Sequence, residues 1–241
     1  MTTSLKPEAL VLIPGLMSDA AVWQAQIAAL QATLPIQVID HQEINSIEAM
    51  ALNVLNHAPA RFALAGHSMG GRVALEVMRQ APERVSHLAL LDTACHAIAN
   101  AGAAEKERET RYGFLKLAQE RGLSFMARRW VMNMVHADHL QDDKLINGIA
   151  QMFTRQSIAT YAAQIHALLN RGELFPVLKH IRCPTLMLCG REDASTPVAI
   201  HEEMVTELAK PDFVIVEHCG HMSTLEQPAA VTAALKAWLE K

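Results

Sequence analysis

Short, continuously apolar runs recur along the chain and predict strands that are buried on both faces of a sheet. Each run ends in polar or turn-forming residues, and apolar residues between most runs recur at intervals of three and four, which is typical of amphipathic helices. The expected strands are 9–13, 36–40, 61–65, 85–92, 183–190 and 212–217.

The expected helices lie between these strands, at 22–30 (capped by Ser18 or Asp19), 46–56, 71–79, 197–208 and 228–239. Strands that alternate with helices imply a parallel sheet with right-handed crossovers. The sequence therefore predicts an α/β fold.

The alternation stops after Thr93, and residues 94–180 contain no convincing strand. Their apolar positions predict about four helices, and the segment is too apolar to be disordered. We therefore expect a core formed by residues 1–93 and 181–241, with residues 94–180 inserted after the fourth strand as a helical cap. We expect the two parts to form a single structural unit.

The composition is that of a globular protein of 241 residues, with 19% charged and 51% hydrophobic residues. The formal net charge of −4 argues against nucleic acid as the main partner. The N-terminus has no apolar signal-like run, and no segment approaches the roughly 18 apolar residues of a membrane span. The four scattered cysteines fit buried free thiols, so we expect a cytoplasmic protein. No pair of histidines has the spacing of a zinc site.

The segment Gly66–His67–Ser68–Met69–Gly70 fits the pattern G-x-S-x-G. An apolar run precedes it and an amphipathic helix follows it, which is the strand–turn–helix context of a nucleophile elbow. Glycines two residues before and after Ser68 permit the close approach that such a turn needs. Ser68 is therefore the candidate nucleophile.

A serine hydroxyl needs a base to take its proton and an acid to orient that base. The loops after the last two strands offer both kinds of residue in the order serine, acid, histidine. We expect His221 to be the base and Asp193 to be the acid. The alternatives are His218 for the base and Glu192 or Asp92 for the acid, although we expect Asp92 to cap the first inserted helix.

An oxyanion hole needs two backbone donors. The N–H of Met69, after the nucleophile, and the N–H of Leu16, in the loop after the first strand, are the candidates. The His67 side chain is expected to point away from the hydroxyl and to serve packing.

These features together resemble the α/β-hydrolase superfamily, in its small helical-capped branch of esterases, enol-lactonases and C–C-bond hydrolases. The resemblance covers nearly the whole chain and rests on the segments 11–15, 66–71, 90–93, 190–197 and 220–222. The family usually has His-Gly after the first strand, where this chain has Pro14-Gly15, so the hydrogen bonds of that histidine must come from elsewhere. Two further N-terminal strands common in the family have no room here, so about six strands are expected.

The resemblance and the triad imply a serine hydrolase that cleaves a small or medium carboxylic ester, thioester or lactone through an acyl-enzyme, with no cofactor or metal. One alternative is a C–C bond hydrolase or lyase that uses the same triad. Another is a non-catalytic small-molecule receptor on the same fold, which would bind tightly and turn over very slowly.

Two features of residues 94–180 bear on the substrate. Apolar side chains that we expect to line the pocket, unless they pack only within the cap, are Met126, Trp130, Met134, Met152 and Phe153. Arginines that would attract an acidic substrate or an acidic carrier protein are Arg108, Arg111, Arg121, Arg128 and Arg129. Because glutamates are interleaved with these arginines, a solvated mixed-charge helix is the preferred interpretation.

Overall fold

The computed structural model describes residues 7–241; the sequence prediction that the extreme N-terminus lacks a signal-like run falls largely outside them. Six parallel strands form one sheet in the order β2-β1-β3-β4-β5-β6, which confirms the predicted strand number and direction. The strands are β1 (Leu10–Ile13), β2 (Ile36–Val38), β3 (Phe62–His67), β4 (Val85–Leu91), β5 (Thr185–Gly190) and β6 (Pro211–Val216).

Burial along the strands follows their place in the sheet. Every residue of β1, β3, β4 and β5 is buried, as continuous apolar runs require. The two edge strands β2 and β6 are mostly half-buried, and β2 ends at Val38, two residues before the predicted end. An edge strand has a partner on one side only, so β2 receives fewer cross-strand contacts.

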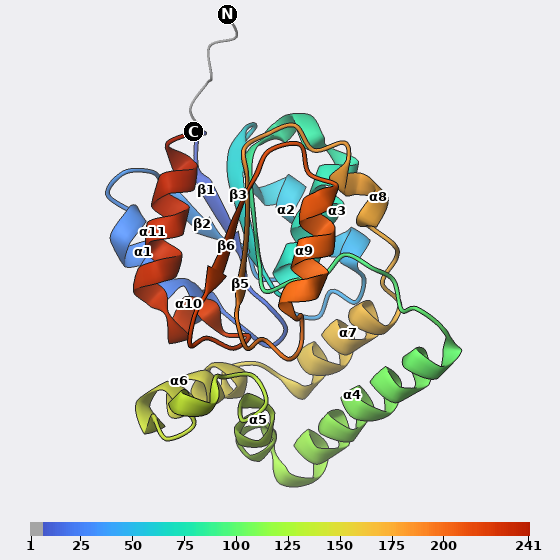
Figure 1. Ribbon diagram of the computed structural model, residues 1–241. Helices are drawn as coiled ribbons and strands as arrows, with labels where there is room; N and C mark the ends of the chain where they lie inside the picture. The colour runs from blue at the N-terminus through green and yellow to red at the C-terminus, as the bar shows by residue number, and fades with distance from the viewer. Residues whose placement is uncertain (1–6) are drawn as a thin grey trace, which may run out of the picture.

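Helices cover both faces of the sheet, giving three layers (Figure 1). On one face lie α1 (Gln24–Leu30) and α11 (Pro228–Leu239), and on the other lie α2 (Ile47–His57), α3 (Met69–Gln80) and α9 (Val198–Thr206). A 3₁₀ turn at Ala20–Trp23 leads into α1 and is capped by the Asp19 carboxylate.

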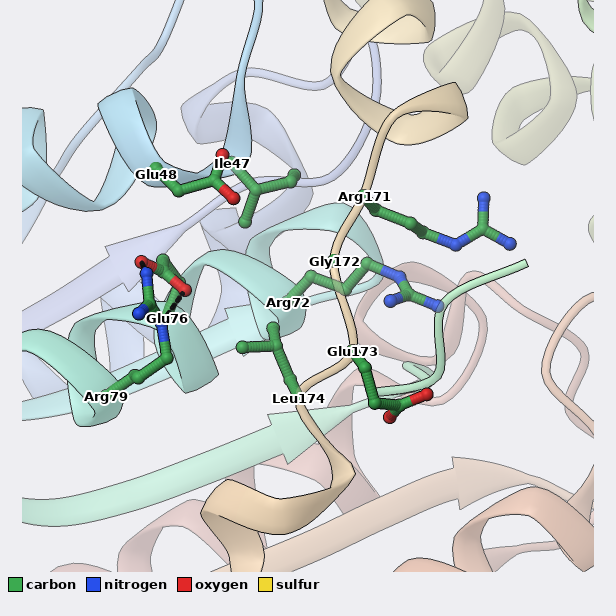
Figure 2. A pocket seen from close by; sticks show the side chains of 9 residues that line it. All are labelled: Ile47, Glu48, Arg72, Glu76, Arg79, Arg171, Gly172, Glu173 and Leu174. Atoms are coloured by element: carbon green, nitrogen blue, oxygen red, sulfur yellow. Dashed lines mark hydrogen bonds and ion pairs between the residues drawn. The ribbon is translucent and has the colours of Figure 1, made fainter. Parts of the chain in front are cut away.

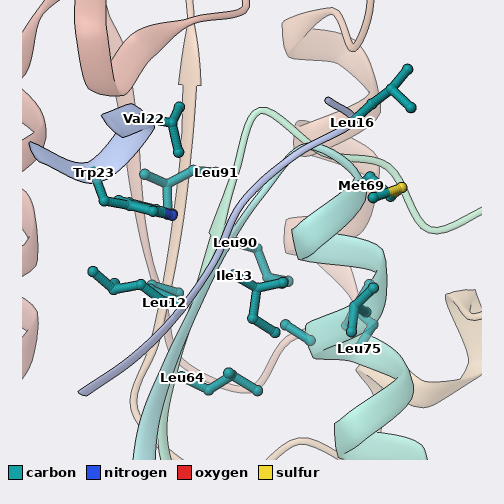
Figure 3. Packing of buried hydrophobic residues seen from close by; sticks show 14 of the residues in the cluster. Leu12, Ile13, Leu16, Val22, Trp23, Leu64, Met69, Leu75, Leu90 and Leu91 are labelled. Atoms are coloured by element: carbon teal, nitrogen blue, oxygen red, sulfur yellow. The ribbon is translucent and has the colours of Figure 1, made fainter. Parts of the chain in front are cut away.

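The central strands present alternate side chains to the two helical layers (Figure 3). Leu12 lies on the side of Trp23, and Ile13 lies on the side of Leu75 from α3. All four side chains are fully buried, so β1 has no face in contact with solvent. Parallel pairing with β3, from Leu10 opposite Ala63 to Ile13 opposite Gly66, holds the carboxyl ends of the two strands close together.

The chain between β4 and β5 contains no strand among its described residues. It forms α4 (Ala101–Arg121), α5 (Leu123–Val131), a 3₁₀ turn at Ala137–His139, α6 (Asp143–Thr154), α7 (Ile158–Leu169) and the short α8 (Phe175–Leu178). The four longer helices lie beyond the carboxyl ends of the strands (Figure 1). We call residues 94–180 the helical insertion. Among residues 7–241, no helix is both long and apolar enough to cross a membrane.

Candidate active site

Ser68 occupies the turn between β3 and α3 in a strained backbone conformation, with φ 55° and ψ −118°. Two glycines make this turn possible because neither has a Cβ. A Cβ on Gly66 would lie 2.2 Å from the carbonyl oxygen of Gly70, and a Cβ on Gly70 would lie 2.3 Å from the carbonyl oxygen of Ile13. The turn places the Ser68 hydroxyl at the carboxyl edge of the sheet, at the N-terminus of α3. Side chains at these positions would force the strand and helix apart.

The structure brings Ser68, His221 and Asp193 into one hydrogen-bonded chain. His221, in the loop after β6, places Nε2 2.8 Å from Ser68 Oγ. Its Nδ1 lies 2.8 Å from Oδ2 of Asp193, which follows β5. With the proton on Nδ1, His221 donates to Asp193 and accepts from the Ser68 hydroxyl, the arrangement that a serine nucleophile needs.

Asp193 is only 3% exposed, and every hydrogen bond that its carboxylate accepts favours the charged form. Its carboxylate accepts hydrogen bonds from the N–H groups of Ser195 and Thr196 and from the Thr196 hydroxyl. Burial opposes ionisation, but the charge of His221 and these hydrogen bonds lower the pKa of Asp193 to about 2. Burial of His221 acts to lower its pKa, and the facing Asp193 reverses this, so that the pKa of His221 is raised above its ordinary value.

Among residues 7–241, the alternative base and one alternative acid make no hydrogen bond to the Ser68 hydroxyl or to the His221 side chain. The His218 side chain is 73% exposed, and its Nδ1 lies 3.6 Å from an oxygen of Asp138. Glu192 is exposed and accepts a hydrogen bond from Cys219 N–H at 3.1 Å. Glu192 therefore supports the backbone of the histidine loop rather than the imidazole.

Asp92 is fully buried beside the site but makes no hydrogen bond to the His221 side chain within residues 7–241. One of its oxygens accepts from Gly190 N–H at 3.0 Å, and the other accepts from the Ser223 hydroxyl. The expectation that Asp92 caps the first inserted helix is wrong, because α4 begins nine residues later and is capped by Asn100. Asp92 instead joins the end of β4 to β5 and to α10 (Ser223–Glu226).

The two candidate oxyanion donors, Leu16 and Met69, line the same cavity as Ser68. Within residues 7–241, neither N–H has a protein acceptor, so both are available to a bound group. The loop that carries Leu16 is held by Gln164 of α7, whose Oε1 accepts from Met17 N–H at 2.8 Å. Because Gln164 lies 148 positions beyond Leu16 in the sequence, no local pattern could have identified it.

The loop that carries His221 is tied to the helical insertion. His221 N–H donates to the Met134 carbonyl at 2.7 Å. Glu226 accepts from the N–H groups of Gly220, Met222 and His136, and it contacts His139 Nδ1 at 2.9 Å. Behind the triad, His67 is buried against Trp23 and places Nε2 2.8 Å from the His221 carbonyl oxygen. The His67 side chain therefore packs in the core, as expected, and also contacts the backbone of the loop that carries His221.

A cavity of about 730 Å³ opens at Ser68 between the core and the helical insertion, which is the size of a small-molecule site. Of the predicted pocket side chains, Trp130 and Met134 line it. Met126, Met152 and Phe153 are buried among the helices of the insertion and are not among the lining residues. Apolar spacing on a helix identifies a buried face but not the surface against which that face packs.

The arginines singled out in the sequence do not act as one patch. Arg108 pairs with Glu105, Arg121 lies over the Phe125 ring, Arg128 donates to Asn147, and Arg129 is exposed. Only Arg111 lines the cavity, together with two arginines that the sequence did not single out, Arg72 and Arg171.

Fold and site together define a hydrolase of the α/β type. The chain belongs to the alpha/beta hydrolase family, whose model matches residues 10–235. It is similar to a pimeloyl-[acyl-carrier protein] methyl ester esterase of Nitrosomonas europaea (25% identity over 98% of this chain and 97% of the relative). It also resembles 3-oxoadipate enol-lactonase 2 of Acinetobacter baylyi (23% identity, over 97% and 90%). Among solved structures, a malate-bound thermophilic esterase of Thermogutta terrifontis has a TM-score of 0.84 (26% identity, over 98% and 90%).

Proposed function

We propose that the protein hydrolyses a small or medium carboxylic ester, thioester or lactone through an acyl-enzyme. Ser68 Oγ attacks the carbonyl carbon while His221 Nε2 takes the hydroxyl proton. His221 then returns this proton to the leaving alcohol or thiol, and the acyl group remains on Ser68. Water, deprotonated by His221, attacks the acyl carbon and releases the acid, which restores the Ser68 hydroxyl.

Asp193 and two backbone N–H groups support both steps. Asp193 holds the proton on Nδ1 of His221, so that Nε2 faces Ser68, and it stabilises the imidazolium formed on attack. The N–H groups of Leu16 and Met69 receive the negative charge that develops on the carbonyl oxygen. The helical insertion, as a cap domain, sets the shape of the cavity that accepts the acyl group.

One observation carries this proposal. The Ser68 hydroxyl, the imidazole and the buried carboxylate form an unbroken chain of 2.8 Å contacts that ends in a cavity with two unused N–H donors. The names of the relatives support ester or lactone substrates in particular. A free small molecule is the preferred substrate over a carrier-bound one, because Arg108, Arg121 and Arg128 already contact Glu105, Phe125 and Asn147 within the insertion.

The proposal is tested with p-nitrophenyl esters from acetate to laurate. We expect turnover that peaks at one short or medium chain length, with a burst of p-nitrophenol when deacylation is the slower step. Mass spectrometry of the acid-quenched protein is expected to find the acyl group on the peptide that contains Ser68.

Two outcomes would contradict this mechanism. An acyl adduct on another residue would remove Ser68 as nucleophile. Absence of turnover across the whole series would favour carbon–carbon cleavage, lyase chemistry or a receptor that binds without turnover.

The pH dependence follows from the pKa of His221. The base must be neutral to take the Ser68 proton, and Asp193 raises the pKa of His221 above its ordinary value of 6.5. Activity is therefore lost as the pH falls through that raised pKa, and kcat/KM for a neutral ester should reach half its maximum above pH 6.5. A profile of kcat/KM from pH 5 to 9 measures this half-maximum. A half-maximum below pH 6 would show that Asp193 does not stabilise the protonated form of His221.

A further inference from the structure

Arg72 is a buried cation whose guanidinium has no hydrogen-bond partner among residues 7–241. The residue is 8% exposed, and its Nη1 is completely buried and unpaired. A buried charge is costly unless it is paired, so native proteins seldom leave a guanidinium in this state. An unpaired buried guanidinium that borders a cavity points to an anion that enters the cavity.

The position of Arg72 brings it to the Ser68 cavity. It lies one turn along α3 from the nucleophile, and its own N–H donates to the Ser68 carbonyl at 3.4 Å. Figure 2 shows its side chain extending in the same direction as that of Arg171, away from Glu48 and Arg79. Both guanidinium-bearing side chains line the cavity that contains Ser68.

The neighbouring charges leave this part of the cavity positive. Arg171 makes two hydrogen bonds to Glu107, at 2.7 and 2.8 Å, and Arg111 contacts the same carboxylate at 2.7 and 2.8 Å. Two guanidinium groups, those of Arg111 and Arg171, thus share one carboxylate, and the cavity lining contains two further cations, Arg72 and Lys106. The other carboxylate in the lining, Asp92, is engaged by Gly190 and Ser223.

The protonation state of Arg72 is consistent with an incoming anion. Burial, with the charge of Arg171, lowers the pKa of Arg72 to about 9, so the side chain is still a cation at neutral pH. A carboxylate placed against it would reverse this shift and would satisfy the buried donor.

We propose that Arg72, with Arg111 and Arg171, forms a carboxylate-binding subsite for the acyl part of the substrate. The substrate would be a half-ester of a dicarboxylic acid or a lactone with a free carboxylate, whose far end pairs with Arg72 while its reacting carbonyl lies at Ser68. Hydrolysis breaks the acyl–oxygen bond and adds water, so a half-ester yields a dicarboxylate and an alcohol. This inference rests on the proposed ester hydrolase function and names the substrate class.

The test compares monomethyl and dimethyl adipate, which differ in charge at one end, on wild type and Arg72→Met. Methionine keeps an unbranched side chain and removes the charge. We expect the ratio of kcat/KM for the monomethyl ester to that for the dimethyl ester to fall by about 10- to 100-fold in Arg72→Met. An unchanged ratio would overturn the subsite.

Arg79→Met is the matched control. It is the same substitution two turns along the same helix, at an arginine that is paired with Glu76 and lies outside the cavity. We expect its ratio to equal that of wild type. Thermal unfolding separates a structural role from a binding role, because removal of an uncompensated buried charge should leave Tm unchanged or raise it. A marked fall in Tm would instead identify Arg72 as a structural residue.

A binding measurement keeps the subsite testable without turnover. Adipate is titrated calorimetrically into Ser68→Ala protein and into the Ser68→Ala, Arg72→Met double variant. Binding that the second substitution removes would support the subsite, and absence of adipate binding to Ser68→Ala would overturn it. Failure of wild type to hydrolyse either ester would instead count against the proposed function.

Discussion

Ser68→Ala is expected to lower kcat by about 10⁵- to 10⁶-fold with little change in KM. The substitution removes the only atom that forms the covalent bond to the acyl group. The cavity, the Leu16 and Met69 N–H groups and His221 all remain, so substrate still binds. Alanine and serine face the same backbone strain at φ 55°, and the fold should be unaffected.

The measurement is steady-state hydrolysis of the best p-nitrophenyl ester, with thermal unfolding followed by circular dichroism. Ser195→Ala is the matched control, because Ser195 also lines the cavity but its hydroxyl faces the Met134 sulfur at 3.4 Å. Its kcat should stay within about threefold of wild type, as is usual away from the chemistry. Retention of more than a few per cent of activity by Ser68→Ala would refute the assigned nucleophile.

Asp193→Asn is expected to lower kcat by about 10⁴-fold, by analogy with the same substitution in a serine protease triad. An asparagine oxygen or amide facing Nδ1 no longer fixes the proton on that nitrogen, and it no longer offsets the charge of the imidazolium. The loss should fall on kcat, because Asp193 itself is not among the cavity lining residues.

Asp92→Asn is the comparison that separates the two buried carboxylates. An asparagine oxygen can still accept from Gly190 N–H, and its amide can donate to the Ser223 oxygen. We expect kcat within about tenfold of wild type and a loss of unfolding free energy of about 1–3 kcal/mol. A larger effect on kcat at Asp92 than at Asp193 would exchange their roles.

The sequence predicted the sheet well because its strands depend on local composition. Continuous apolar runs identify strands that are buried on both faces, and all six were placed within a few residues. The largest errors are two residues, at the end of β3, at the start of β5 and at the end of β2, which lies at the sheet edge. The length of β2 depends on its pairing with β1, and the local sequence pattern does not predict strand pairing.

The turn at Ser68 could be predicted for a similar reason, since its glycine spacing is local. Contacts across long stretches of sequence could not. The pairing of Gln164 with Met17 and the position of Arg171 beside Arg72 depend on how α7 and the following segment meet the core. Asp92 was misassigned because its partners come from Gly190 and Ser223, which lie about 100 and 130 positions away.

The hydrogen bond from His221 to the Met134 carbonyl limits how this enzyme can be re-engineered. Exchanging the insertion for that of a relative is an obvious way to alter specificity. The new insertion must then supply a backbone carbonyl in the position of Met134 and a backbone N–H in the position of His136. A graft that omits them would release the loop carrying the base. The turn between α5 and α6 therefore has to be kept together with the core when the rest of the insertion is exchanged.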